Sequence, residues 1–544
     1  MCTNSKNHQP AQPGTDIHKQ EHERWNRRSF LQALGLAGGG TMMLANTNIT
    51  ASRPSELTRA IAAADTDNIL VLVRLKGGND GLNTIVPLYD YDNYANLRPT
   101  IKIPEKSLYK LSDNFGIPPA MKDLESMWGE GAMKVIHGVG YENQDLSHFK
   151  SSNIWANSDI EDLEDSGFMG RYYEELHPDF LSNPPKIPAA IQIGSIGNLI
   201  FDGRGVSNYA VTVANPKQLR GIAENEGLHG LNDVPDCTYG DRLKYLRSVT
   251  NNTFTYAKTI SEAYFKGGAP SVQYEVNPEG GKRKLGEQLK IVAQMIKGGL
   301  GTRVYMVSLG GFDTHGNQAE DHAELMTSLS NSVKVFYEDL KTAGLEEKVL
   351  TMTFSEFGRR AEENGSKGTD HGQAAPVMLF GPAIDDNGFI GTHPSLTDLD
   401  RIGNLKYSFD FREIYASVMK DWLCIDAGAV DRALLGKTFE PRSFGFTCRG
   451  IDDDILTVLN FFHSTSQQNG QTYLHIKKNN TSHINITLYD ATGAKVKTIK
   501  NEMRGPGKET INISEEIGRG YSTGIYLYRI LNGDDKYSAK IYVP

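Results

Sequence analysis

The feature that most constrains this chain is an alternation that begins at Ile69. Short apolar runs rich in β-branched residues, typical of buried strands, are separated by longer segments with helical periodicity. We predict strands over residues 69–75, 134–137, 189–193, 303–309, 348–354 and 376–380. We predict helices over residues 286–297, 323–340 and 411–422. Such alternation predicts an α/β domain built on a mostly parallel sheet with helices on both faces.

The pattern changes after residue 446, where short strands and turn residues follow one another without a long helix. The alternating runs cover residues 484–490, 494–496, 511–513, 524–528 and 540–543. Alternation with period two, interrupted by turns, is typical of antiparallel strands with one buried face. We therefore expect a small antiparallel β-sandwich over residues 453–544.

The first residues have the order of an export signal. Asn26, Arg27 and Arg28 precede an apolar, glycine-rich run over residues 33–45, which is shorter than a membrane-spanning helix. This order resembles a twin-arginine signal, so we expect the twin-arginine translocase as a partner and cleavage of the leader. We expect the leader over residues 1–64 and the α/β domain over residues 66–449. No later apolar run is long enough to predict an integral membrane segment after cleavage.

Composition excludes some classes of function and leaves the cysteines undecided. The formal net charge of the 544 residues is -9, which gives no broad attraction to nucleic acid. Cys2, Cys237, Cys424 and Cys448 show no CxxC pair, so neither a zinc knuckle nor a disulfide framework is indicated. A bridge between Cys424 and Cys448 and a pair of buried free thiols both remain open.

Three of the predicted strands are each followed by a turn or a polar residue and then an acidic residue. Asp80 follows the strand at 69–75, Asp313 follows the strand at 303–309, and Glu356 follows the strand at 348–354. In open parallel sheets ligands bind beyond the carboxyl ends of the strands. We therefore expect these carboxylates to converge. His315 stands two residues after Asp313, so an extended backbone would place both side chains on one side.

A fourth segment adds Asp370 and His371 just before the strand at 376–380. Mixed carboxylates and imidazoles suit zinc, manganese or a related divalent ion, whereas sets of oxygen ligands alone suit calcium or magnesium. The candidate metal ligands are Asp80, Asp313, His315, Glu356, Asp370 and His371. The cofactor we expect is a divalent metal, with zinc, manganese and calcium all open.

Residues 145–149 follow the strand at 134–137 and are expected to open a helix that runs to about residue 155. Ser147 near the start of this helix has two interpretations. It is either an activated nucleophile, favoured by the helix dipole, or an N-cap residue. His148 is a further candidate for the site.

Each candidate also has a purely structural interpretation. Asp80 in the turn at 77–81 could bond only its own backbone. Glu356 with Arg359 and Arg360 could form a surface ion pair. We expect Glu320 and His322 at a solvated helix start. The shared placement of the acidic residues at strand ends favours a functional site.

Five motifs in this order resemble the DUF1501 family, which is related to the alkaline phosphatase and sulfatase superfamily. They are Lys76 to Asn83, Ser147 to Phe149, Gly311 to His315, Ser355 to Arg359 and Thr369 to Gly372. The resemblance implies an alkaline-phosphatase-like α/β fold. It also implies metal ligation by Asp80, Asp313, His315, Glu356 and His371, with Ser147 or a metal-bound hydroxide as the attacking group. Arg359 would clamp an oxygen of the transferred group.

Two departures from that superfamily matter for activity. Glu356-Phe357 stands where superfamily hydrolases usually have an Asp-His dipeptide, and Ser147 lacks the sequence context of a sulfatase nucleophile. The resemblance implies an exported metal-dependent hydrolase acting on a phosphate or sulfate ester in an anionic small molecule or polysaccharide. The alternative is a non-catalytic protein of the cell surface that binds such a ligand or supports envelope assembly.

The last ninety or so residues resemble the C-terminal sorting domain of the type IX secretion system. The similar features are an Asp-x-x-Gly turn at Asp490 and a Gly-x-Tyr strand at Gly524. An immunoglobulin-like binding module is the alternative. The sorting interpretation implies type IX machinery as a partner, passage through the periplasm, and a final place at the cell surface or in the medium.

Overall fold

The computed structural model describes two compact units, Asp67–Thr447 and Cys448–Pro544. The predicted leader, including Arg27 and Arg28, lies outside the described residues. These are residues 67–178, 180, 184–194, 197–204, 208–223, 234, 243, 247, 254, 256–274, 285–384, 388–446, 448, 461–468, 471–478, 481–490, 495–518, 524–533 and 535–543.

The first unit is built on a nine-stranded sheet with the order β13-β5-β12-β9-β1-β8-β6-β7, to which β14 adds by pairing with β5. The strands are β1 Ile69–Lys76, β5 Met133–Gly140, β6 Ala190–Ile193, β7 Ala210–Val213, β8 Val304–Gly310, β9 Val349–Phe354, β12 Ala375–Phe380, β13 Gly388–Ile390 and β14 Phe409–Asp410. All six strands expected from the apolar runs are present, with bounds that differ by a few residues.

The sheet is mostly parallel, as predicted. β1 lies between β8 and β9 and pairs with both in parallel, and β6 continues the parallel set beyond β8. β12 is the exception, because it pairs antiparallel with both β5 and β9. The parallel centre places the carboxyl ends of β1, β8 and β9 at one edge, where the acidic residues follow.

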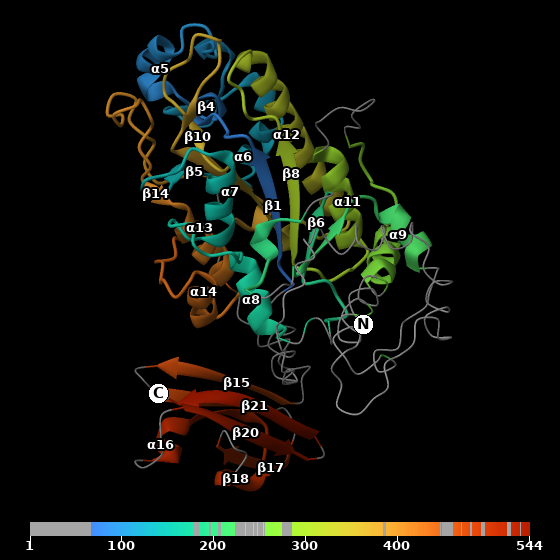
Figure 1. Cartoon of the computed structure of the whole chain (residues 1–544). Coiled ribbons are helices and arrows are strands. Elements are labelled where there is room, and N and C mark those ends of the chain that lie inside the picture. The colour runs from blue at the N-terminus through green and yellow to red at the C-terminus, as the bar shows by residue number, and fades with distance from the viewer. Residues whose placement is uncertain are drawn as a thin grey trace, which may run out of the picture. The chain divides into compact units, whose positions relative to one another are not determined.

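Helices cover both faces of this sheet (Figure 1). Along β1 the side chains alternate, so that Val71 and Val73 join one apolar cluster while Leu70 and Leu72 join the other. The first cluster contains residues of α6 Leu124–Gly129, α11 Leu285–Lys297 and α12 Gln318–Lys341; the second contains residues of α7 His148–Asn157, α8 Phe168–Leu176, α13 Phe411–Ser417 and α14 Ala427–Ala433. The unit is therefore a three-layer α/β structure.

Two helices differ from the expected bounds. α12 begins at Gln318, five residues before the periodic pattern starts, because its polar first turn carries no apolar stripe. The helix expected over 411–422 is α13 followed by a π-helical stretch, Val418–Trp422. A π-helical turn shifts the side-chain positions by one residue, which periodicity alone does not reveal.

The second unit contains two antiparallel sheets, with the orders β15-β16-β19 and β18-β17-β20-β21. The strands are β15 Phe461–Gln468, β16 Gln471–Lys478, β17 Ser482–Tyr489, β18 Lys495–Arg504, β19 Gly507–Asn512, β20 Gly524–Asn532 and β21 Asp535–Val543. Their inward residues, such as Ile486 and Tyr528, form one apolar core. The expected small antiparallel structure is present.

The strand expected over 511–513 is wrong at its end, because Ile513 begins the short helix α16 Ile513–Ile517. The Asn512 side chain accepts a hydrogen bond from the Glu515 amide and so caps this helix. β15 and β16 are not predicted, since their polar sequences show little apolar alternation. Most of the turn expected at Asp490 lies outside the described residues.

Cys424 and Cys448 are both disulfide-bonded, so the interpretation as free thiols is wrong for these two residues. Disulfides persist in oxidising compartments and are rare in the cytosol. Among the helices of the described part of the chain, none combines the length and the apolarity that a membrane span requires.

Candidate metal centre

The loops that follow β1, β8 and β9 meet at the carboxyl edge of the sheet. The Phe312 amide donates to the Lys76 carbonyl oxygen at 3.1 Å, which joins the first loop to the second. The Gly77 amide donates to Glu356 Oε1 at 2.9 Å, which joins the first loop to the third. These contacts bring the three strand ends together, as the sequence pattern predicts.

A two-stranded hairpin adds His371 to this edge. β10 Gly358–Arg359 pairs antiparallel with β11 His371–Gly372, so that Arg359 lies opposite His371. The Arg359 guanidinium is buried and donates to the carbonyl oxygens of Gly78 and Thr369, both at 2.8 Å. It also donates to the carbonyl oxygens of Gly77 and Phe312, so Arg359 fastens the loops to one another.

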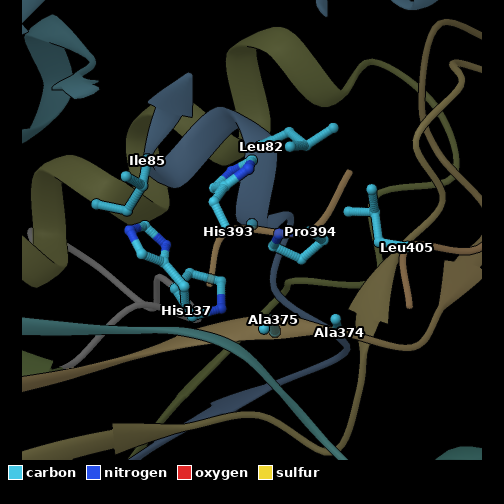
Figure 2. A pocket seen from close by; sticks show the side chains of 11 residues that line it. Leu82, Ile85, His137, Ala374, Ala375, His393, Pro394 and Leu405 are labelled. Carbon is cyan, nitrogen blue, oxygen red and sulfur yellow. The ribbon is translucent and has the colours of Figure 1, made fainter. Parts of the chain in front are cut away.

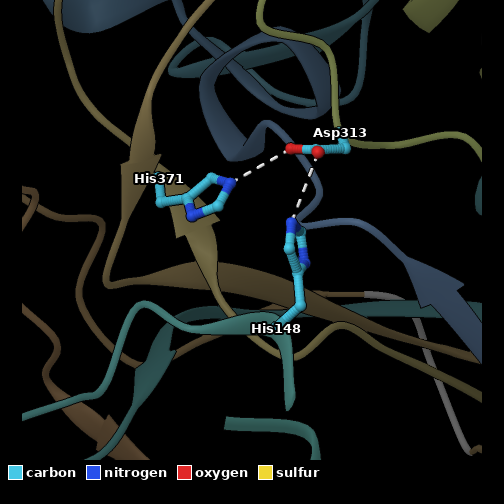
Figure 3. Close-up of side chains that lie close together, drawn as sticks. All are labelled: His148, Asp313 and His371. Atoms are coloured by element: carbon cyan, nitrogen blue, oxygen red, sulfur yellow. Dashed lines mark hydrogen bonds and ion pairs between the residues drawn. The ribbon is translucent and has the colours of Figure 1, made fainter. Parts of the chain in front are cut away.

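Asp313 is the point at which the site residues converge (Figure 3). Its Oδ1 lies 3.0 Å from His371 Nε2 and 3.1 Å from His315 Nε2, and its Oδ2 lies 3.3 Å from His148 Nε2. The Nε2 atoms of His315 and His371 are themselves 3.0 Å apart. We call His148, Asp313, His315 and His371 the histidine–aspartate centre. Three of them, His148, Asp313 and His371, offer ligand atoms that all lie within 4.8 Å of one another.

The other nitrogen of each histidine faces an oxygen that only accepts hydrogen bonds. His371 Nδ1 lies 2.8 Å from the Leu146 carbonyl oxygen, and His148 Nδ1 lies 3.0 Å from Glu356 Oε1. His315 Nδ1 lies 3.4 Å from Asp370 Oδ1. A neutral ring that carries its proton on Nδ1 donates it to this oxygen and directs its Nε2 lone pair toward Asp313.

This donor set fits a divalent metal ion. Histidines that bind metals in proteins usually donate their second N–H to a carboxylate or a backbone carbonyl, which fixes the tautomer and the ring orientation. The three rings have that arrangement, and Asp313 adds one carboxylate. Three imidazoles and one carboxylate suit zinc or manganese better than calcium, which prefers oxygen ligands.

The electrostatics of the centre favour an ionised Asp313. The pKa of Asp313 is lowered to about 2: burial acts to raise it, but the hydrogen bond from Arg359 and the contact with His371 outweigh burial. The Glu356 carboxylate, through its hydrogen bond, raises the pKa of His148, whereas burial lowers the pKa of His371. The lowered pKa favours the neutral form of His371, which is the form that ligates metals.

Glu356 and Asp370, both predicted as ligands, lie one layer behind the histidines. Glu356 is buried, and its Oε1 faces Gly77 and His148 rather than a surface arginine. Its Oε2 is buried and has no hydrogen-bond partner among the described residues. Asp370 faces His315 and accepts a hydrogen bond from Asn364 Nδ2 at 3.2 Å.

Asp80 lies in a separate buried network. Its Oδ2 accepts from Arg98 Nη1 at 2.6 Å and from Gln318 Nε2, and its Oδ1 accepts from the Leu82 amide at 3.2 Å. The Leu82 contact caps the short helix α4 Gly81–Thr84, as the structural interpretation of this turn expects. These hydrogen bonds of the Asp80 carboxylate are thus to groups outside the histidine–aspartate centre.

His322 corrects another expectation, because it is buried and not solvated. Its Nε2 lies 3.1 Å from Asn79 Oδ1, and burial lowers its pKa to about 4. Glu320 is exposed, as expected. The sequence could have signalled the difference, since His322 stands three residues before Leu325 on the apolar face of α12.

Ser147 occupies the N-cap position of α7 but makes no side-chain capping hydrogen bond. Its side chain is exposed, and its amide donates to Asp145 Oδ1 at 2.7 Å. Ser147 therefore stands directly before His148 with a hydroxyl that is not used as a cap.

Two further histidines, outside the histidine–aspartate centre, line a small hollow (Figure 2). His137 and His393 lie there among apolar side chains such as Leu82 and Leu405. Burial lowers the pKa of His137 to about 3 and that of His393 to about 4. The cavity volume is about 10 Å³, which is close to the space needed for one water molecule. The hollow is too small for an ester substrate.

Two family models match parts of the chain. Residues 272–406 match the family described as protein of unknown function DUF1501, and residues 469–544 match the secretion system C-terminal sorting domain. Both resemblances inferred from the motifs are confirmed over these residues. The DUF1501 match includes Asp313, His315 and His371, whereas His148 lies outside it. The sorting domain implies export to the cell surface or the medium by the type IX secretion machinery.

Solved structures with a similar arrangement include three bacterial proteins. The lipoteichoic acid synthase LtaP from Listeria monocytogenes has a TM-score of 0.27 and 7% identity, and the match covers 85% of this chain and 93% of that chain. A protein in the alkaline phosphatase superfamily from Vibrio parahaemolyticus has a TM-score of 0.28 and 8% identity, with 88% of this chain and 92% of that chain covered. The PsFucS1 sulfatase from Pseudoalteromonas sp. has a TM-score of 0.28 and 11% identity, with 86% of this chain and 88% of that chain covered. No curated protein sequence matches the chain.

Proposed function

We propose that this chain is an exported metal-dependent hydrolase that acts on a phosphate or sulfate ester. The single observation that carries the proposal is the histidine–aspartate centre, in which three Nε2 atoms surround one carboxylate. Nitrogen lone pairs directed at a carboxylate repel it unless a proton or a cation lies between them. A divalent cation satisfies all four groups at once.

The ligands of that cation would be His148, His315, His371 and Asp313. Such an ion lowers the pKa of a bound water or hydroxyl and stabilises negative charge on a transferred group. Leu146, Glu356 and Asp370 would hold the three imidazoles in the ligating tautomer through their Nδ1 contacts. Arg359 would keep Asp313 ionised and hold the loops in place.

The Ser147 hydroxyl is the proposed attacking group. It precedes a ligand of the centre, and its position at the start of α7 places it at the positive end of the helix dipole. An anionic group bound there would be stabilised in the same way. The alternative attacking group is a water molecule held at the centre. Removal of the Ser147 hydroxyl distinguishes these two attacking groups.

We also propose the route of export. The twin-arginine leader would carry the chain across the inner membrane after folding, with its cation loaded in the cytoplasm. The sorting domain would then direct it from the periplasm to the surface. Replacing Arg27 and Arg28 by lysine would strand the precursor in the cytoplasm if this leader is used.

The test of activity uses aryl phosphates and aryl sulfates with the purified full chain. Wild type should turn over at least one class, a chelator should abolish turnover, and zinc or manganese should restore it. Ser147→Ala should keep the metal and lose turnover by at least about a hundredfold, because a covalent nucleophile acts in the rate-limiting chemistry. Glu320→Gln, an exposed control, should match wild type.

The competing function is a surface protein that binds an anionic ligand without turnover. A wild type that holds a stoichiometric metal but hydrolyses neither class of ester would favour it. The sequence observation behind this alternative is that Glu356-Phe357 stands where superfamily hydrolases usually have an Asp-His dipeptide.

A further inference from the structure

Lys76 stands at the same sheet edge as the histidine–aspartate centre. It is the last residue of β1, and its side chain is exposed although the rest of this central strand is mostly buried. The next residue, Gly77, donates its amide to Glu356, which in turn faces His148. Two residues thus separate Lys76 from a ligand of the centre along this chain of contacts.

The pleat of β1 directs Lys76 to the face of the sheet that α7 covers, because Leu70 and Leu72, at even positions of the same strand, join the apolar cluster that contains residues of α7. Side chains two residues apart in a strand lie on the same face, so Lys76 shares a face with Arg74. Arg74 Nη2 donates to Ser152 Oγ of α7 at 2.6 Å. The Gly77 amide and His148 Nδ1 contact the same atom, Glu356 Oε1, so the end of β1 lies beside the start of α7. Arg74, earlier in β1, contacts Ser152, later in α7, so strand and helix run in opposite directions. Lys76 therefore lies level with the first turn of α7.

The space beside Lys76 is open. Its register partner on the neighbouring strand is Gly310 of β8, and partners in a parallel pair direct their side chains to the same face. A Cβ atom added at Gly310 would have no heavy atom of the described residues within 4 Å, its chain neighbours aside. The sheet face at this level thus leaves room for a ligand next to an exposed ammonium group.

Lys76 changes the net positive charge that the metal-loaded centre would offer to an anionic ligand. Asp313 is offset by Arg359 at 2.8 Å, and Asp370 is offset by Arg360 at 3.7 Å. Among the described residues at the centre, a divalent cation would then be opposed by the buried Glu356 carboxylate, which leaves one positive charge. Lys76 raises this surplus to two. Phosphate monoesters carry two negative charges above a pH of about 6, whereas sulfate monoesters carry one.

We infer that Lys76 binds a non-bridging oxygen of the substrate, so that the centre takes dianionic phosphate monoesters in preference to monoanionic sulfate esters. This inference rests on the proposed function and assigns its substrate class. The role is recognition: Lys76 supplies a charge that complements the second charge of the phosphoryl group.

The test compares two stable anions of the same shape, phenylphosphonate and benzenesulfonate, which carry two charges and one charge at alkaline pH. Binding to the zinc-loaded full chain is measured by calorimetry. Lys76→Gln should weaken phenylphosphonate about tenfold and benzenesulfonate about threefold, because the interaction scales with the charge of the ligand. Lys76→Arg should retain the preference. Lys110→Gln, at the exposed end of β3 Tyr109–Lys110, is the control and should change neither affinity.

The outcomes separate the two proposals. If zinc-loaded wild type prefers phenylphosphonate but Lys76→Gln keeps its zinc and both affinities, the inference about Lys76 is wrong and the metal centre stands. If wild type takes up no zinc, or binds neither anion when loaded with zinc, the proposed function is wrong, and the inference about Lys76 is then wrong as well.

Discussion

At the scale of single residues, Glu356→Gln tests whether the carboxylate behind His148 matters for metal binding. The change keeps an oxygen that can accept from Gly77 and removes the charge that holds the proton on His148 Nδ1. We expect zinc affinity to fall roughly 10–100-fold, the range found when such supporting carboxylates are lost. Competition with a metal chelator measures the change. An unaltered affinity would show that His148 needs no carboxylate to present Nε2.

The buried His322 predicts how stability depends on pH. Its pKa is about 4 in the folded protein and 6.5 in the unfolded chain, so only the unfolded state takes up a proton between these values. The stability it contributes is present above pH 6.5 and is lost as pH falls toward 4, with a slope of up to roughly 1.4 kcal/mol per pH unit.

His322→Gln should flatten the dependence of the free energy of unfolding on pH within that window. His137 has its pKa lowered to about 3 by burial and shares the window, so part of the slope should remain in the variant. Denaturant unfolding at several pH values between 4 and 7 is the measurement. An identical slope in wild type and variant would mean that His322 is protonated without unfolding.

The motifs locate residues that lie together at the sheet edge better than they locate the layer in which each residue lies. Asp313, His315 and His371 lie together as expected, but the backbone between Asp313 and His315 turns instead of staying extended. The turn is shown by the His315 amide, which donates to the Asp313 carbonyl oxygen at 3.1 Å. Glu356 is predicted as a ligand but lies behind a histidine. Which layer a carboxylate occupies depends on the direction of its side chain after the turn, and sequence spacing does not encode that direction.

At the scale of elements, each apolar run that was expected to form a strand of the large sheet coincides with a strand in the structure. The reason is that buried central strands are continuously apolar. The short hairpin of β10 and β11 is not predicted, since two-residue strands have no periodicity. That hairpin carries Arg359 and His371, so the site is completed by an element that has no signal in the hydrophobic pattern.

Gly77 is the position where the loop after β1 tolerates no side chain. Its φ is +127°, and a Cβ atom would collide with the backbone of Phe312 and Asp313. Gly77→Ala should lower the free energy of unfolding by about 2 kcal/mol or more, through strain and displacement of the Asp313 loop.

Gly344→Ala is the matched control for Gly77→Ala. Gly344 has a φ of +66°, but a Cβ atom added there would have no heavy atom of the described part of the chain within 4 Å, so the change adds backbone strain alone. Its cost should be about 1 kcal/mol. Equal losses of stability in the two variants, measured by denaturant unfolding, would show that the contact with the Asp313 loop is unimportant.

At the scale of the whole molecule, the change from helical periodicity to alternating strands predicted a separate C-terminal β unit. The match of residues 469–544 to a sorting domain gives that unit a role in export. Its first two strands, β15 and β16, escaped prediction because antiparallel strands with a solvated face carry a weaker apolar signal than buried parallel ones.

Truncation after residue 449 tests the independence of the two units. The variant keeps Cys448 and removes the β unit, so the α/β unit should stay folded and should remain in the periplasm of the native host. Fractionation and thermal unfolding read out both effects. Truncated protein at the cell surface would contradict the sorting role, and an unfolded product would show that the β unit supports the fold.

Elemental analysis of the full chain purified from its native host, together with thermal unfolding with and without a chelator, tests whether the histidine–aspartate centre holds a metal ion. We predict a stoichiometric zinc or manganese ion in wild type and a lower unfolding temperature after chelation. His371→Ala and Asp313→Asn should lose the ion, while Glu320→Gln should keep it. A wild type without a stoichiometric ion and without any response to chelator would contradict the metal centre.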